Sequence, residues 1–138
     1  MRIEVLEIPG RLDLILKELN ENAGFRASLF STSAGLVLAS QREPDVDEAV
    51  VAAMGSLLSD TASKVGEELS LNSELESIKV LFKEFLIICR NIEIEKTLFI
   101  LAVLAPVPES QEIEKYYDQL LDWAEENALP ELKSLASI

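Results

Sequence analysis

Histidine is absent from the 138-residue sequence, and cysteine occurs once, at Cys89. Without an imidazole the chain cannot form a Ser-His or Cys-His catalytic pair or bind zinc through histidine. A single cysteine also rules out an internal disulfide. Only carboxylate chemistry or no chemistry remains, so we expect a protein that is not an enzyme and that holds no metal and no cofactor.

Basic residues and long hydrophobic runs are also scarce. Twelve Lys and Arg stand against 25 Asp and Glu, a net charge of −13, which would repel nucleic-acid phosphates. The longest apolar run covers residues 98–105, whereas a bilayer span needs about twenty residues. The first residues mix acids with Pro9 and Gly10, unlike a secretory signal. We therefore expect a cytoplasmic protein with no nucleic-acid partner and no membrane insertion.

The chain has the length of one domain with a single core. Near the start, Leu12, Ile15, Leu16 and Leu19 recur at i, i+3, i+4 and i+7, which predicts a helix that Gly24 would end. Residues 25–31 then alternate between apolar and polar types. A small polar turn separates them from the apolar residues 36–39, so this segment is typical of a β-hairpin.

A long helix is predicted over residues 46–69, with Asp45 as its cap and Glu48 completing a capping box. Its apolar residues cover about half of the helix circumference, more than the roughly 100° that one core requires. They form two stripes. One contains Val46, Val50, Ala53, Met54 and Leu57, and the other contains Val51, Leu58, Ala62, Val65 and Leu69. We expect the second stripe to be covered by another molecule.

Three further strands are predicted at residues 78–82, 85–89 and 98–105, with the charged residues 91–96 between the last two. The first of them alternates apolar residues with lysines, as an edge strand does. The last is apolar at every position, as in a strand buried on both faces. The sheet should therefore be covered by helices on both sides.

Residues 106–138 differ in composition from the rest of the chain. They hold eight acidic residues and two lysines, a net charge of −6. Apolar and aromatic side chains still recur there at helical spacing, so we expect an amphipathic helix. These residues are Ile113, Tyr116, Tyr117, Leu120 and Ala124.

The order of elements resembles the roadblock or dynein-light-chain family, which includes bacterial MglB and the Ragulator subunits. The hairpin at residues 24–40, the long Ala- and Ser-rich helix and the strand that begins near Ile78 carry the resemblance. It implies an α/β/α sandwich: a five-stranded antiparallel sheet with the long helix on one face and the N- and C-terminal helices on the other. Residues 1–138 would be one such domain, with a core of about 10–105 and an acidic helical extension at 106–138.

The resemblance also implies a non-enzymatic protein that dimerises and serves as a scaffold or regulator for a small Ras-like GTPase. In the family, the third strand pairs with its copy across a two-fold axis while the long helices pack side by side. Carried over to this chain, the homodimer interface would comprise Ile78, Val80 and Phe82 on the strand and Val51, Leu58, Ala62, Val65 and Leu69 on the helix. The alternative function is a small-molecule sensor of PAS or GAF type, which requires polar groups around an apolar cavity.

Several residues allow two interpretations. Arg26, Arg42 and Arg90 could act as arginine fingers, although ion pairing is the more common role of such residues. Cys89 lies in an apolar strand, where packing is expected instead of reactivity. The carboxylates around Asp45 could hold a cation, but they also suit a helix N-terminus. A further set, Tyr116, Tyr117 and Trp123, could bind a partner or pack on the sheet.

Overall fold

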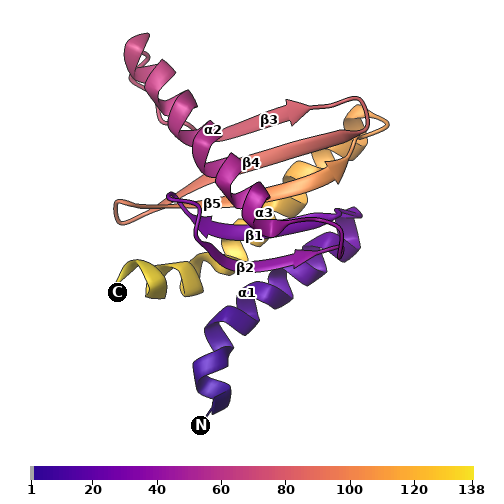
Figure 1. Cartoon of the computed structure of the whole chain (residues 1–138), viewed down its shortest axis with the longest axis vertical. Helices are drawn as coiled ribbons and strands as arrows, with labels where there is room; N and C mark the ends of the chain where they lie inside the picture. The colour runs from indigo at the N-terminus through magenta and orange to yellow at the C-terminus, as the bar shows by residue number, and fades with distance from the viewer. Residues whose placement is uncertain (1) are drawn as a thin grey trace.

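A computed structural model describes residues 2–138, with side chains from residue 10 onward. Three helices and five strands follow one another along the described chain (Figure 1). Their bounds are α1 Arg2–Ala23, β1 Ala27–Thr32, β2 Val37–Arg42, α2 Glu48–Glu68, β3 Ser77–Leu81, β4 Phe85–Ile94, β5 Thr97–Pro106 and α3 Gln111–Ala136. The predicted α/β fold class is confirmed.

All five strands form one antiparallel sheet in the order β2-β1-β5-β4-β3. The central strand β5 is buried over most of its length, as its continuous apolar sequence predicts. The lysine-bearing strand β3 lies at one edge, also as predicted, and pairs with β4. Every pairing joins strands that are consecutive in the chain, except the central pairing of β1 with β5.

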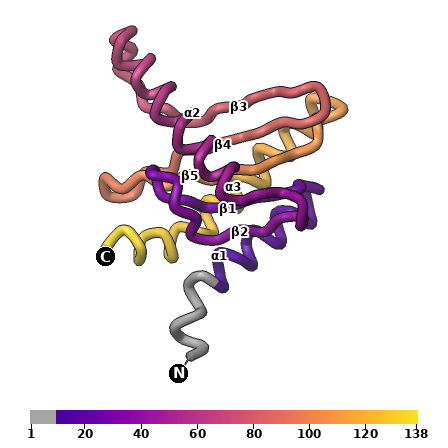
Figure 2. The backbone as a smooth tube through the Cα atoms, in the orientation of Figure 1, coloured from indigo at the N-terminus to yellow at the C-terminus, as the bar shows by residue number. Residues whose placement is uncertain are grey.

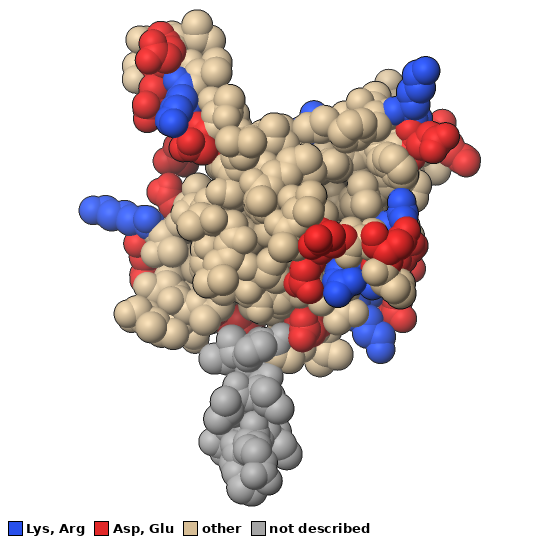
Figure 3. Space-filling model, viewed as in Figure 1, with Lys and Arg blue, Asp and Glu red and all other residues tan. Residues whose placement is uncertain are grey.

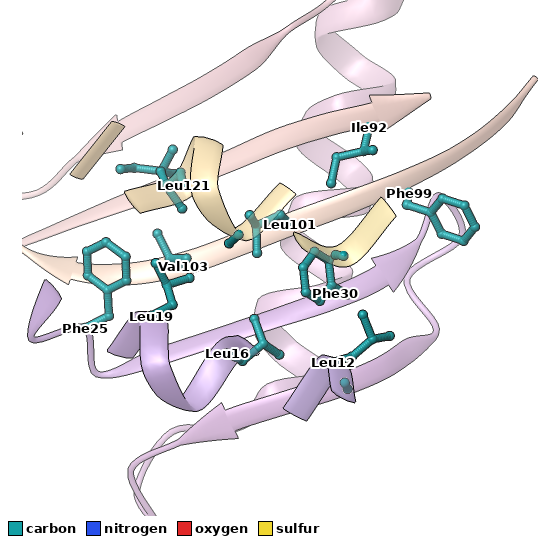
Figure 4. Close-up of a cluster of buried hydrophobic side chains, with 14 of the residues drawn as sticks. Leu12, Leu16, Leu19, Phe25, Phe30, Ile92, Phe99, Leu101, Val103 and Leu121 are labelled. Carbon is teal, nitrogen blue, oxygen red and sulfur yellow. The ribbon is translucent and has the colours of Figure 1, made fainter. Parts of the chain in front are cut away.

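Helices α1 and α3 cover one face of the sheet and pack against each other, while α2 covers the opposite face (Figures 1 and 2). In the larger core, Leu16 from α1 and Leu121 from α3 reach toward Phe30 and Leu101 on the sheet (Figure 4). All four side chains are fully buried. Burial of this kind contributes about 1.5–3 kcal/mol for each large apolar side chain.

The second core, under α2, is made of smaller side chains. Ala52 and Gly55 lie against the sheet, and a Cβ atom built on Gly55 would be 3.6 Å from Cys89 Sγ and 3.6 Å from Ile100 Cγ2. These small residues allow the helix to approach the sheet closely. The buried residues of α2 are Val51, Ala52, Gly55 and Ser59, so the face of the helix that contacts its own sheet is narrow.

Two predicted boundaries are wrong. The N-cap of α2 is Asp47, whose side chain accepts from the Ala49 amide, whereas the Asp45 carboxylate accepts from Arg26 Nη2 at 2.8 Å. Strand β4 continues to Ile94 through residues 91–94, which the charge pattern had placed in a connection. Ile92 and Ile94 are buried and Glu93 between them is exposed, so buried and exposed side chains alternate as in a strand with one solvent-exposed face.

Within residues 2–138, no helix has both the length and the hydrophobicity that a bilayer span requires.

Candidate interaction surface on α2 and β3

One apolar stripe of α2 changes from buried to exposed along the helix. Val51, Leu58, Ala62, Val65 and Leu69 lie at spacings of seven, four, three and four residues, which places them on the same side of an α-helix. Val51 is 8% exposed, Leu58 and Ala62 are half-buried, and Val65 and Leu69 are 51% and 63% exposed. The stripe loses its cover because α2 crosses the sheet obliquely and its C-terminal end projects past it (Figure 1).

The expectation that Val51 faces a second molecule is therefore corrected. Its side chain lies in the core between α2 and the sheet. Conversely, Val50 and Leu57, placed by their spacing on the other stripe, are 61% and 66% exposed. The spacing of the large apolar residues predicted that they face the core, whereas Ala52 and Gly55 occupy the core-facing side. Gly55 was the overlooked signal, since a glycine within a helix often marks close packing.

Strand β3 presents apolar residues on the same side of the sheet as α2. Ile78 and Val80 are half-buried on the α2 side of the sheet, next to the core that Val51 belongs to. Lys79 and Leu81 are on the opposite side, where Lys79 Nζ lies 3.4 Å from Asp118 Oδ1 of α3. Phe82, just beyond the strand, is 49% exposed. We call the combined area the α2–β3 surface, comprising Leu58, Ala62, Val65, Leu69, Ile78, Val80 and Phe82.

The two edges of the sheet differ in how they are covered. At the β2 edge, α1 supplies Asn20, whose Nδ2 donates to the Gln41 carbonyl at 3.0 Å, and Asp13, which accepts from the Ser40 amide. Burial, together with the nearby charge of Glu48, raises the pKa of Asp13 above its ordinary value. At the β3 edge, no described residue from 2 to 138 forms a further strand. The β3 edge is therefore open to pairing.

Charge is distributed unevenly over the face that carries α2 and β3. Figure 3 shows Lys, Arg, Asp and Glu side chains at the rim of this face, while its middle is largely uncharged. A neutral centre with a charged rim is typical of a protein-binding surface.

Among the side chains from residue 10 onward, no cluster of Cys, Asp and Glu is suited to a metal ion.

The three candidate arginine fingers all form ion pairs within the chain. Arg26 contacts Glu43 and Asp45, and its guanidinium carbon lies 5.6 Å from the centroid of the Phe85 ring. Arg42 contacts Glu48 at 3.4 Å. These contacts support the ion-pair interpretation of both residues.

Arg90 has the most extensive set of partners. It is 14% exposed and contacts Asp118, Asp122 and Glu125 of α3, the last at 2.7 Å. Its hydrogen bonds to Asp122 and Glu125 raise its pKa against the opposing effect of burial. Arg90 therefore links the acidic helix α3 to β4, on the face of the sheet opposite α2.

The remaining candidates are mainly packing residues. Tyr117 is buried, donates to the Pro106 carbonyl at 3.1 Å and makes an edge-to-face contact with Phe25. Trp123 packs against the same core, while Tyr116 is 43% exposed. Cys89 is buried, and its burial raises the pKa of the thiol to about 11. A thiol of that pKa is almost entirely protonated at neutral pH.

Two hollows flank α2. The larger, about 1280 Å³, lies between the C-terminal part of α2, the segment 70–76 and the β4–β5 hairpin. The smaller, about 430 Å³, lies beside the β1–β2 turn. Neither is lined by the buried residues of the two cores. They give no support to the PAS- or GAF-like alternative, which needs a ligand cavity inside the core.

Comparison with known proteins identifies the fold. No family model and no curated sequence matches the chain. Solved structures do: Myxococcus xanthus MglB has a TM-score of 0.73 at 10% identity, covering 94% of this chain and 90% of its own. A Roadblock/LC7 domain from Streptomyces avermitilis has a TM-score of 0.73 at 16% identity, covering 87% and 96%. The gliding protein MglB of Thermus thermophilus has a TM-score of 0.73 at 12% identity, covering 90% of each chain.

By its fold, the chain is therefore a roadblock-like domain. Its structural likeness extends to MglB proteins of two organisms over nearly the full length of both partners. The family resemblance proposed from the hairpin, long helix and edge strand is confirmed at this level.

Proposed function

We propose that residues 1–138 form a single roadblock-type domain that is not an enzyme, dimerises through the α2–β3 surface and regulates a small Ras-like GTPase. The observation that carries the proposal is the exposed apolar end of α2 next to an open edge strand. Val65 and Leu69 project from the helix where the sheet no longer covers it. A second copy, placed by a two-fold axis at β3, would supply the missing cover.

The exposed apolar area of this surface supports a dimer. Monomeric proteins rarely leave large contiguous apolar patches in water. Here α2 carries half-exposed aliphatic side chains, β3 carries the half-buried Ile78 and Val80 on the same side of the sheet, and the middle of this face is largely uncharged (Figure 3). A self-complementary contact uses one such patch twice, which is the most common arrangement in soluble oligomers. One structural neighbour, at a TM-score of 0.70 and 11% identity, is described as MglB with a tetrameric arrangement.

The dimer can be tested by light scattering coupled to gel filtration at tens of micromolar protein. The expected mass is twice the chain mass of 15.3 kDa. A monomer at this concentration would refute the proposed assembly. Dilution into the nanomolar range with a fluorescent label would then give the dissociation constant against which variants are compared.

The GTPase partner is supported by the roadblock resemblance and by the structural likeness to MglB proteins. The test uses purified small Ras-like GTPases from the same organism. We expect at least one of these GTPases to be retained by the immobilised chain in at least one nucleotide state. Retention in neither the GDP-bound nor the GTP-analogue-bound state would refute this part and leave the dimer proposal intact.

A further inference from the structure

The hydrogen bonding of β3 defines which backbone groups face its open edge. The Phe82 amide donates to the Phe85 carbonyl, and the Asn91 amide donates to the Glu76 carbonyl. Residues of an antiparallel strand point their N–H and C=O groups alternately to the two sides. Even-numbered residues of β3 therefore bond to β4. The N–H and C=O groups of Ser77, Lys79 and Leu81 point away from the sheet, toward the open edge.

We infer that a second copy of the chain pairs with this edge in one register, with the two-fold axis at Lys79. The inference rests on the proposed dimer and specifies its geometry. In this register Lys79 lies opposite Lys79 of the second copy, and Ser77 lies opposite Leu81. Every edge-facing N–H and C=O group of the strand then finds a partner.

Shifted registers leave some of the edge-facing backbone N–H and C=O groups of β3 without a hydrogen-bond partner. An axis at Val80 places Lys79 opposite Leu81 and leaves Ser77 without a partner inside the strand. An axis at Ile78 places Ser77 opposite Lys79, leaves Leu81 unpaired and sets Glu76 against Val80 on the apolar side. Each backbone bond contributes about 0.5–1.5 kcal/mol. The register centred on Lys79 therefore has the most favourable backbone pairing.

The same register suits the α2 side of the sheet. It places Ile78 opposite Val80 of the second copy, and Val80 opposite Ile78. Directly opposed residues without mutual hydrogen bonds are the closest cross-strand pairs, with Cα atoms about 4.5 Å apart. Both half-buried aliphatic side chains would gain cover beneath the overhanging end of α2.

The α3 side carries the one unfavourable contact of this register, because it brings two lysines together across the axis. Like charges directly opposite each other destabilise strand pairing. In each copy, however, Asp118 of α3 lies 3.4 Å from Lys79 Nζ. Asp118 is in turn held by Arg90. Asp118 therefore acts as a positioning residue for the dimer: it compensates the lysine charge that the pairing requires at the axis.

Cysteine cross-linking tests the register. Directly opposed residues have Cα atoms about 5.5 Å apart when they exchange backbone hydrogen bonds, a distance that a disulfide spans. Ser77→Cys and Leu81→Cys chains of different tag length are mixed, allowed to exchange subunits and oxidised. We expect a mixed cross-linked product, and no product from either variant alone. Native Cys89 is 1% exposed and stays out of the reaction.

The shifted registers have their own signatures. Lys79→Cys linking to Leu81→Cys would place the axis at Val80, and linking to Ser77→Cys would place it at Ile78. Either result, obtained with a chain that is dimeric by mass, overturns the inferred register and leaves the proposed dimer standing. A monomeric mass refutes the dimer itself, so the two failures are distinguishable.

Charge substitutions test the role of Asp118. We expect Asp118→Asn to weaken dimerisation by roughly two- to fivefold, an effect that about 1 M salt removes. The matched control is Asp122→Asn, since Asp122 contacts Arg90 but is not among the ion-pair partners of Lys79. In a Lys79→Met background, Asp118→Asn should have no effect on dimerisation. Equal weakening by Asp118→Asn and Asp122→Asn, or weakening that persists with Met at position 79, would overturn the assignment.

Discussion

Leu69 offers the sharpest test of the idea that α2 reaches beyond its own sheet to cover a second molecule. The substitution is Leu69→Ser, which removes an aliphatic side chain from the projecting end of the helix. Its matched control is Leu36→Ser in the β1–β2 turn. The two leucines are 63% and 67% exposed in the single chain, so both substitutions cost the isolated domain a similarly small amount of buried area.

The expected magnitude follows from the exposed fraction. A fully buried leucine contributes about 2 kcal/mol, so covering the exposed 63% of Leu69 is worth about 1.3 kcal/mol. Because a two-fold dimer buries Leu69 from both copies, the substitution should cost about 2.5 kcal/mol of binding free energy for each dimer. That loss corresponds to a dissociation constant raised by about 60-fold.

The assay is the dilution titration described above, with thermal unfolding of the monomer as a second readout. Leu69→Ser should shift the dissociation constant by more than about tenfold, while Leu36→Ser leaves it within about twofold. Both variants should unfold within a few degrees of each other when measured as monomers. If Leu36→Ser weakened the dimer as much as Leu69→Ser, the assignment of the α2–β3 surface would be refuted.

Three further outcomes concern the stability of the domain. Because Cys89 is 1% exposed in a central strand, and its burial also raises the pKa of its thiol to about 11, iodoacetamide at about pH 8 should label it only as fast as the chain unfolds globally; rapid labelling of the native protein would contradict this burial. Asp13 has a raised pKa, so the native state holds its proton more tightly than the unfolded chain and stability falls as pH rises above the ordinary value for Asp. Asp13→Asn should therefore stabilise the protein at neutral pH and change little below about pH 3, as urea titrations at both pH values can show. Gly55→Ala places its methyl group at ordinary contact distance, so it should raise the unfolding free energy by about 0.5–1 kcal/mol, and a lower melting temperature would show that the contact is too tight.

Much of the architecture could be predicted from residue patterns. Alternation at Ile78 and Val80 against Lys79 predicted an edge strand, and the unbroken apolar run in β5 predicted a central one. Both signals are strong because burial on one face or on two faces imposes different residue patterns along a strand. The absence of histidine and the single cysteine likewise limited the possible chemistry before any fold was known.

The side of α2 that faces its own sheet could not be predicted in the same way. The two apolar stripes are nearly equivalent on a helical wheel, so the spacing of large apolar residues does not choose between them, and Gly55 is a weaker local signal. The choice depends on how closely the helix approaches the sheet, which the small residues Ala52 and Gly55 permit on their side of the helix. Val51 therefore proved to be a core residue, and Val50 and Leu57 proved to be exposed.

By itself, the sequence determined the order of elements, the edge and centre of the sheet and the excess of apolar surface on the long helix. These properties depend on periodicity and composition, which are local. Only the tertiary structure decided where that excess lies, because exposure depends on the crossing angle of α2 and on where the sheet ends. It also decided that Lys79 and Arg90 share Asp118 on α3, a contact between residues far apart in the chain that no local pattern encodes.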